Sequence, residues 1–146
     1  MQKVIVLGSC NTGKTRLVEN RLNTTPTDGI SCVRLQTNGK LYVIWDTSGQ
    51  PIYQSLVRSM MKQSDIAIVL YSTLDTYMHA LNCVSEARAN GLRVVSVNTG
   101  RTHMRIRADL EFKLNLERPD DYLQYILKQL CKEDSSNLYI DHCCQC

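Results

Sequence analysis

The strongest constraint on the fold is the stretch GSCNTGKT at residues 8–15, which directly follows the apolar run VIVL at residues 4–7. Its spacing is G-x-x-x-x-G-K-T, and an amphipathic helical pattern follows it. A strand, a glycine-rich loop and a helix in this order let backbone N–H groups at a helix N-terminus cradle phosphates. Glycine is needed at Gly8 and Gly13, because the backbone must turn with positive φ and approach the phosphates closely. The stretch therefore predicts a phosphate-binding loop.

The side chains that end this loop, together with a second motif, predict a metal-assisted phosphate site. Lys14 supplies a point charge to the outer phosphates, and the Thr15 hydroxyl is a ligand for Mg²⁺. The second motif is WDTSGQ at residues 45–50, which closes a predicted strand. Asp46 is placed there to hold Mg²⁺ through water, and Gln50 follows where a side chain could orient an attacking water.

Periodicity divides the rest of the chain into alternating strands and helices. Apolar runs predict six strands, at residues 4–7, 31–37, 40–45, 66–71, 93–97 and 111–116. Helices are predicted to begin at four residues, Lys14, Pro51, Asp75 and Pro119. This alternation predicts an α/β fold with a mostly parallel central sheet, helices on both faces and a ligand site at the carboxyl ends of the strands.

Spacing also predicts the buried faces of two helices and a hairpin. In the helix after Pro51, the inward residues are expected to be Ile52, Leu56 and Met60, with Val57 and Met61 beside them. In the helix at residues 75–90 they are expected to be Tyr77, Leu81, Val84 and Ala87. Asn38 and Gly39 predict a hairpin. From Glu133 onward the sequence is polar and aperiodic, so we expect one domain at residues 1–132 and a flexible tail at residues 133–146.

Composition excludes several classes of protein. The 146 residues carry a net charge of +3, without a run of basic residues or an aromatic stacking platform, so we expect no nucleic-acid partner. There is no charged-then-apolar leader and no apolar stretch near the ~20 residues of a transmembrane helix. The seven cysteines are scattered or bunched at the end, and one lies inside the phosphate loop. We therefore expect reduced thiols and a cytoplasmic protein.

With both motifs in this order, residues 3–130 resemble a small GTPase of the Ras superfamily, with a shortened P-loop G domain. The resemblance implies Mg²⁺ and GTP or GDP as ligands, with GTPase-activating factors, exchange factors and effectors as partners. It implies nucleotide contacts from Gly8, Asn11, Thr12, Gly13, Lys14, Thr15, Gly49, Asn98 and Leu116. PTDG, at residues 26–29, resembles a switch segment of the family, so Thr27, or Thr25 as second choice, would join Thr15 and Asp46 around Mg²⁺. Gln50, Lys14 and Thr27 are the implied catalytic residues.

The resemblance fails where the family binds guanine. The family has an Asn-Lys-x-Asp motif there, whereas this chain has NTGR at residues 98–101. Asn98 is retained, but Thr99 replaces the lysine and Arg101 the aspartate, and arginine has no acceptor for the guanine edge. The family's Ser-Ala-Lys segment corresponds to residues 115–117, where only a backbone N–H near Leu116 could reach the base. Weak guanine binding, binding with little base preference, and loss of nucleotide binding all remain open.

The chain ends in HCCQC, and its last three residues, Cys144 to Cys146, resemble the Cys-x-Cys signal by which Rab-type GTPases receive two geranylgeranyl groups. Two lipid chains anchor stably where one is marginal. The alternatives are a single prenyl group on Cys143, a cysteine-rich end without function, and a metal clip made by His142, Cys143, Cys144 and Cys146, although ligands packed so tightly close a tetrahedral site with difficulty. The expected location is the cytosolic face of a membrane.

The leading hypothesis is a divergent Rab-like GTPase that acts as a GTP/GDP switch with slow hydrolysis in membrane traffic, with some Arf-like spacing between Thr27 and Trp45. The alternative is a pseudo-GTPase or nucleotide-promiscuous module that sequesters GTPase partners at membranes. A P-loop kinase of small metabolites is disfavoured because WDTSGQ and the lipid-type tail have no place in one. The basic stretch at residues 101–107 is interpreted as a solvated loop, with contact to a partner or an acidic lipid as the sharper hypothesis.

Overall fold

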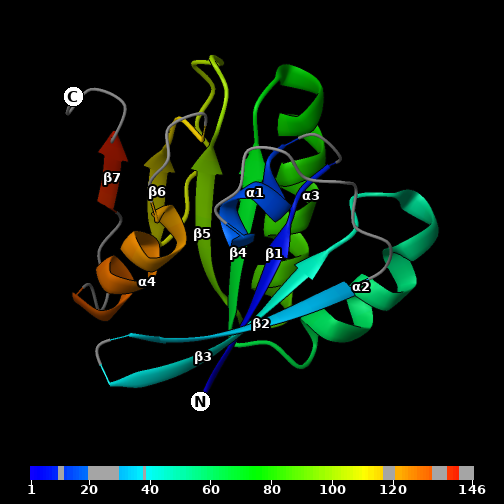
Figure 1. Cartoon of the computed structure of the whole chain (residues 1–146). Helices are drawn as coiled ribbons and strands as arrows, with labels where there is room; N and C mark the ends of the chain where they lie inside the picture. The colour runs from blue at the N-terminus through cyan, green and yellow to red at the C-terminus, as the bar shows by residue number, and fades with distance from the viewer. Residues whose placement is uncertain (10–11, 20–29, 38, 117–120, 133–137, 142–146) are drawn as a thin grey trace.

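A twisted seven-stranded sheet runs through the molecule in the order β2-β3-β1-β4-β5-β6-β7 (Figure 1). The computed structural model describes residues 1–9, 12–19, 30–37, 39–116, 121–132 and 138–141. The strands are β1 (Gln2–Leu7), β2 (Ile30–Thr37), β3 (Lys40–Thr47), β4 (Ile66–Tyr71), β5 (Arg93–Asn98), β6 (Leu110–Lys113) and β7 (Leu138–Asp141). Only β2 and β3 pair antiparallel, and every other neighbouring pair is parallel. The predicted α/β fold class is confirmed.

Helices cover both faces of the sheet, so each strand buries side chains on two sides. The helices are α1 (Lys14–Glu19), α2 (Gln54–Met61), α3 (Leu74–Ala89) and α4 (Tyr122–Lys132), and a short 3₁₀ turn, η1 (Pro51–Tyr53), precedes α2. One core lies between the sheet and α1 with α4, and the other lies between the sheet and α2 with α3. Alternate β1 residues divide between the two cores, since Val4 and Val6 face the first and Ile5 and Leu7 the second.

Local sequence signals explain where the helices begin and end. Thr73 and Thr76 form a capping box at the start of α3, in which each side chain satisfies a backbone N–H of the first turn. Gly91, with φ of +77°, follows the end of that helix, as expected for a residue that leaves a helix in the left-handed region. At the start of α4 a carboxylate oxygen of Asp121 accepts the N–H of Gln124 at 3.1 Å.

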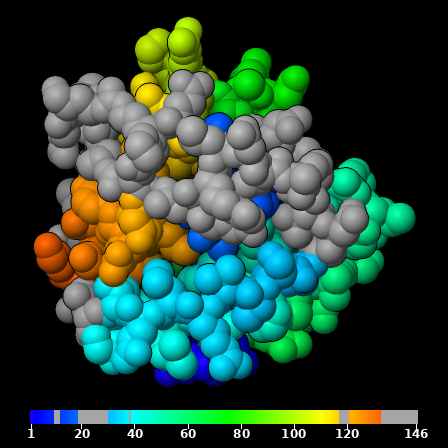
Figure 2. Space-filling model, in the orientation of Figure 1, coloured from blue at the N-terminus to red at the C-terminus, as the bar shows by residue number. Residues whose placement is uncertain are grey.

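The α4 helix and the β2–β3 hairpin form adjacent parts of one face of the molecule (Figure 2). Val33 and Leu35 on β2 pack against the core that α4 covers. Four apolar residues of α4, Leu123, Ile126, Leu127 and Leu130, are all buried. No helix of the described residues is long and apolar enough to cross a membrane.

Two predicted helix faces are partly wrong. In η1 and α2, Ile52 and Leu56 are exposed, while Met61 is buried and Val57 and Met60 pack at the edge of the core. The cause is the 3₁₀ turn, whose three-residue period rotates Ile52 away from the face that α2 buries. In α3, Leu81 is exposed, and Ala80 takes the inward position together with Val84 and Ala87.

The end of the chain also differs from the expectation. Residues 138–141, inside the segment expected to be a flexible tail, form β7, which pairs parallel to β6 from Leu110↔Leu138 to Lys113↔Asp141. Leu, Tyr and Ile at residues 138–140 favour a strand, and the open edge of β6 offers unpaired backbone groups. The predicted switch threonines, Thr25 and Thr27, and the terminal cysteines lie outside the described residues.

Candidate nucleotide site

The candidate site lies where β1 and β3 end side by side. The two strands are parallel neighbours, and their register pairs Val6 with Asp46. The loop that begins at Gly8 therefore leaves the sheet beside the DTSGQ segment that follows Trp45. Ligands in open α/β sheets bind outside the carboxyl ends of the strands, as both motifs require here.

Glycine is required at both ends of the phosphate loop. Gly8 has φ of +146° and Gly13 has φ of +94°, a backbone region that side chains disfavour. A Cβ at Gly8 would lie 2.7 Å from the carbonyl oxygen of Leu70, and a Cβ at Gly13 would lie 2.6 Å from Cδ1 of Leu116. Both the positive φ values and the lack of room for a Cβ therefore support the prediction that these two positions require glycine.

Lys14 is held against the loop that it follows. Its Nζ donates to the carbonyl oxygens of Gly8 and Ser9, both at 2.8 Å, and the residue is buried. The hydroxyl of Thr12 also donates to the Ser9 carbonyl at 2.8 Å, which stabilises the turn. A buried ammonium group on the inner side of a phosphate-type loop favours an anion there, since charge is costly to bury without a counter-charge.

Thr15 and Asp46 form a pair of hard oxygen donors beside the loop. The Thr15 hydroxyl donates to Oδ2 of Asp46 at 2.8 Å, and Asp46 is fully buried at the end of β3. The next residue, Thr47, donates to the carbonyl of Val6 at 2.6 Å, which ties β3 to β1 at this point. A hydroxyl and a carboxylate are the oxygen ligands that Mg²⁺ prefers, so the donor set fits this ion.

Gln50 and Gly49 border a cavity between α2 and α3. The cavity has a volume of about 330 Å³ and is lined by Gly8 and Gly49 at one end and by both helices along its sides. The N–H of Gln50 donates to the hydroxyl of Ser48 at 3.1 Å, and Gln50 sits half-buried just before η1. The predicted water-orienting residue therefore lies between the phosphate loop and α2.

Two side chains of α3 beside this cavity have perturbed acidities. Burial, with a smaller contribution from Lys14, lowers the pKa of His79 below its ordinary value, so the neutral ring is favoured. Burial, with the nearby carboxylate of Glu86, raises the pKa of Cys83 to about 11. The two side chains lie 3.5 Å apart, between Nε2 of His79 and Sγ of Cys83. At neutral pH this wall of the cavity therefore carries an uncharged imidazole and a protonated thiol.

The segment expected to bind the base, residues 98–101, is hydrogen-bonded to the phosphate loop. The hydroxyl of Thr99 donates to the carbonyl of Thr12 at 2.8 Å, and the N–H of Thr99 donates to Tyr71 at 2.9 Å. The amide of Asn98 braces its own loop, because Nδ2 donates to Thr102 at 2.8 Å while Oδ1 accepts the N–H of Gly100 at 3.0 Å. Thr99, which replaces the family lysine, has become a link within the site.

Gly100 and Leu116 complete this side of the site. A Cβ at Gly100 would collide with the carbonyl group of Ser72, so the loop lies against the end of β4. Leu116 is buried, and its side chain packs against Gly13. Arg101 is exposed, and it stands where the family has the aspartate that accepts from guanine. Chemistry for holding phosphates is present, whereas the acidic group that would select guanine is missing.

The structure brings most of the predicted residues together: Gly8, Thr12, Gly13, Lys14, Thr15, Asp46, Gly49, Gln50, Asn98 and Leu116 all lie around the carboxyl edge of the sheet. Asn11 and Thr27 lie outside the described residues. The sequence did not predict the hydrogen bond from Thr99 to Thr12 or the close approach of Gly100 to Ser72. For Gly100, the available signal was a glycine inside the loop that follows a buried strand. Among the described residues, no group of three or more potential ligands is placed to hold a metal by itself.

The fold and the site define the class of this protein, a P-loop nucleotide-binding domain. Comparison with known proteins gives the family: the model described as "Ras of Complex, Roc, domain of DAPkinase" matches residues 3–99. Human Ras-related protein Rab-44 is 30% identical over 108 residues, which cover 63% of this chain and 10% of Rab-44. Ras-related protein Rab-22A of Canis lupus familiaris is 33% identical over 101 residues, which cover 61% of this chain and 52% of Rab-22A.

A third relative, Ras-related protein Rab-7B of Dictyostelium discoideum, is 35% identical over 74 residues, which cover 47% of this chain and 38% of Rab-7B. The matched part thus spans about half of Rab-22A and a tenth of Rab-44. The chain belongs to the Roc family of Ras-like GTPase domains and is a divergent, Rab-like member of the Ras superfamily.

Proposed function

We propose that this protein is a Mg²⁺-dependent GTP/GDP switch that hydrolyses GTP slowly. The observation that carries the proposal is the constellation of Lys14, Thr15 and Asp46 around a loop whose Gly8 and Gly13 have no room for a side chain. Family membership adds the expectation that a guanine nucleotide is the ligand.

The residues of the phosphate side have distinct tasks in this proposal. Lys14 exchanges its two carbonyl partners for phosphate oxygens when the nucleotide enters. Thr15 and, through water, Asp46 would hold Mg²⁺, and Thr27 would be the ligand from the first switch. The bound metal would supply positive charge that neutralises the outer phosphates. Gly49 offers its N–H to the γ-phosphate, and Gln50 orients the water that attacks it.

The proposed switch is a change of order that depends on the γ-phosphate. Thr27 and Gly49 contact that group only in the GTP state, so the segments at residues 23–30 and 48–62 would change conformation on hydrolysis. Such a site turns over slowly alone, because it has no arginine in the first switch to stabilise charge in the transition state. GTPase-activating factors, exchange factors and effectors are the partners that this proposal requires.

The proposed setting is the cytosolic face of a membrane, in vesicle traffic. Prenyl groups on Cys144 and Cys146 would anchor the chain, because two lipid chains bind stably where one is marginal. The proposed domain organisation is a G domain whose sheet extends to β7 at Leu138–Asp141, followed by a terminal segment that carries the anchor.

A nucleotide-binding module with little base preference is the second candidate, and Arg101 favours it. Arginine offers only donors at the position where guanine needs an acceptor. In that case the chain would bind GTP and ATP comparably and would act by sequestering partners of GTPases at membranes.

Hydrolysis is tested by single-turnover reactions of GTP with the purified chain, with Gln50→Leu as the variant and Gln36→Leu, at an exposed position of β2, as the matched control. Removal of a group that orients the reacting water should lower the rate by about 10²-fold or more, whereas the control should retain it. Equal rates for all three proteins would contradict the role of Gln50, whereas no hydrolysis by the unmodified chain above the rate in buffer would contradict the hydrolase and leave a pseudo-GTPase.

A further inference from the structure

The last helix carries the chain across the sheet, away from the nucleotide site. Helix α4 begins near the carboxyl edge of the sheet, where the hydroxyl of Tyr122 donates to the carbonyl of Asn115 just after β6 at 2.8 Å. It ends at the opposite, amino edge. There Nη1 of Arg93, the first residue of β5, donates to the carbonyl of Leu130 at 3.2 Å. The direction of the strand that follows α4 therefore decides from which edge the chain departs.

Strand β7 returns the chain to the carboxyl edge (Figure 1). It pairs parallel with β6, so its last residue, Asp141, lies opposite Lys113, the last residue of β6. Lys113 in turn pairs with Asn98 at the end of β5. Neighbouring strands lie ~4.8 Å apart, so Asp141 lies about 10 Å from the residue that opens the base-side loop. The chain therefore leaves the sheet beside the nucleotide site.

The reach of the chain beyond β7 is short compared with the depth of the sheet. An extended chain spans at most about 3.6 Å per residue, so the Cα atom of Cys144 lies within about 11 Å of that of Asp141, and that of Cys146 within about 18 Å. At β5, which has six residues, the sheet is about 20 Å deep. While β7 stays paired, Cys144 therefore cannot reach the amino edge, and Cys146 approaches it only with the chain fully stretched.

We propose that the protein lies on the membrane with the carboxyl edge of its sheet toward the lipid, and that β7 sets this orientation. The inference rests on the proposed prenylation of Cys144 and Cys146, because the lipid would fix these residues at the bilayer surface. The base-side loop, residues 98–101, then lies next to the lipid headgroups, and the amino edge points away from them. Without β7 the tether would begin at Lys132, at the end of α4 on the amino edge.

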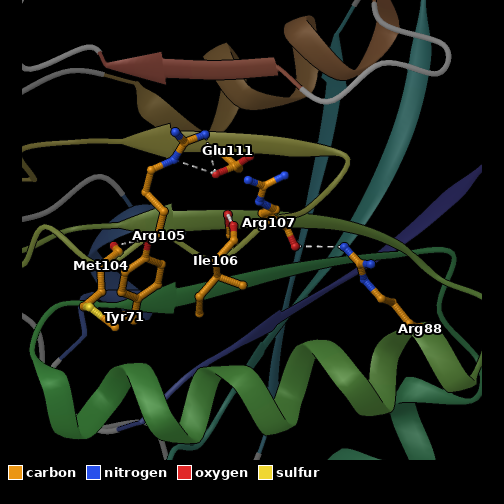
Figure 3. A network of polar contacts seen from close by, with 8 residues as sticks. Tyr71, Arg88, Met104, Arg105, Ile106, Arg107 and Glu111 are labelled. Atoms are coloured by element: carbon orange, nitrogen blue, oxygen red, sulfur yellow. Dashed lines mark hydrogen bonds and ion pairs between the residues drawn. The ribbon is translucent and has the colours of Figure 1, made fainter.

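The orientation is measured with one reporter on each edge of the sheet. Trp45 is the single tryptophan of the chain, so Trp45→Phe provides the background for both reporters. Met104→Trp marks the carboxyl edge, because Met104 is exposed and its carbonyl accepts the hydroxyl of Tyr71, the last residue of β4, at 3.1 Å (Figure 3). Gln63→Trp marks the amino edge, because Gln63 is exposed in the turn that leads into β4. The two variants are matched, since each replaces one exposed side chain.

The test is energy transfer from each tryptophan to dansyl-labelled lipid in vesicles that bind the geranylgeranylated full chain. The two edges are about 20 Å apart, so transfer should be at least about twofold higher from Met104→Trp than from Gln63→Trp. Equal transfer from the two reporters, or higher transfer from Gln63→Trp, would overturn the proposal.

The role of β7 is tested by adding Tyr139→Pro with Ile140→Pro to both reporter chains. Proline has no backbone N–H, so the pair removes two donors from the strand and should release it from β6. The tether then starts on the amino edge, and the preference for Met104→Trp should be lost or reversed. Tyr139→Thr with Ile140→Val is the matched control, because it keeps both N–H groups and strand-favouring side chains and should keep the preference. A preference that the two prolines leave unchanged would overturn the role of β7.

A second experiment separates this inference from the proposed prenylation. A histidine tag added after Cys146 binds the unlipidated full chain to vesicles that contain nickel-chelating and dansyl-labelled lipid, so the same end is tethered without prenyl groups. We expect the same preference for Met104→Trp, reduced by the longer tether. Its absence would contradict the orientation, whereas unmodified Cys144 and Cys146 in the mass spectrum of the chain from a prenylating host would contradict the proposed prenylation.

Discussion

The two sides of the nucleotide site have diverged to different degrees. On the phosphate side, Lys14, Thr15 and Asp46 are buried or hydrogen-bonded in an arrangement that suits phosphate and Mg²⁺. On the base side, the Thr99 hydroxyl donates a hydrogen bond to the phosphate loop, and the exposed Arg101 stands where the family has an aspartate. The family model matches residues 3–99, which include the phosphate loop, the DTSGQ segment and the first two residues of the base-side motif.

The difference teaches which part of such a site the fold itself requires. The phosphate loop links β1 to α1, and its glycines fit against Leu70 and Leu116, so a change there disturbs the sheet edge as well as the ligand. The base-side loop contributes to the fold through backbone contacts and short side chains, which tolerate loss of the lysine and aspartate. In this chain the phosphate side is therefore tied to the sheet by contacts that the exposed Arg101 of the base side lacks.

Among the tests that compare the two sides of the site, the largest effect is expected for Asp46→Asn. The substitution removes the negative charge that would hold Mg²⁺ through water, and loss of such an outer partner typically costs 10- to 100-fold in metal affinity, about 1.4–2.7 kcal/mol. Titration of Mg²⁺ against a fluorescent guanine nucleotide bound to the chain measures it. An unchanged Mg²⁺ requirement would show that Asp46 has only the structural bond to Thr15.

The contact between the two sides is tested by Gly13→Ala. A side chain at positive φ and against Leu116 should lower the free energy of unfolding by roughly 1–2 kcal/mol. When Leu116→Ala is added to Gly13→Ala, the side chain that the new Cβ would meet is removed. The share of the stability loss that is due to this contact should then be recovered, whereas the share that is due to the positive φ should remain. Urea unfolding of the four proteins of this cycle measures both parts, and purely additive losses would mean that the two residues do not meet.

The role of the base side is tested by restoring the two family residues that it lacks. Thr99→Lys with Arg101→Asp supplies the family lysine and aspartate, so the preference for GTP over ATP should rise by about tenfold or more. Competition between the two nucleotides measures the ratio, and Arg107→Gln, which like the restored variant lowers the net charge by one, serves as a control for the change in charge. If the restored variant discriminates no better than the unmodified chain, the contacts of Thr99 and Gly100 hold the loop in a shape that excludes base selection.

The smallest effect concerns His79, which lies beside the phosphate side. Its pKa is lowered in the folded chain relative to its ordinary value of 6.5, mainly by burial and then by Lys14. Below that value the unfolded chain binds more protons than the folded chain, so stability should fall as the pH falls. Urea unfolding at neutral and mildly acidic pH measures the trend, and His79→Gln should flatten it. An equally steep trend in the variant would assign the loss to carboxylates.

Much of the fold could be predicted from the sequence because its signals are local. Continuous apolar runs marked β4 and β5, and the glycine-rich loop marked the junction of β1 and α1. Two details could not be predicted in this way. A 3₁₀ turn before α2 shifted its buried face, and β7 is placed by its pairing with the edge of β6, which is a tertiary contact.

For the site, the sequence predicted the groups that act on phosphate, since each belongs to a motif with fixed spacing. It could not predict that Thr99 would donate to Thr12, because that contact joins residues 87 positions apart. Nor could it predict that Leu81 would be exposed, since burial of that flank depends on how the segment after β5 runs beside α3. Such contacts follow from the packing of whole elements.

The most direct test of the account is the affinity of the purified chain for labelled GTP and GDP, with and without Mg²⁺, beside the variant Lys14→Ala. The account predicts Mg²⁺-dependent binding that the variant weakens by at least about 100-fold, since a buried charge partner of the phosphates is removed. ATP titrated in parallel measures how far the base side has lost its selectivity. Absence of guanine nucleotide binding, or binding that Lys14→Ala leaves unchanged, would contradict the account.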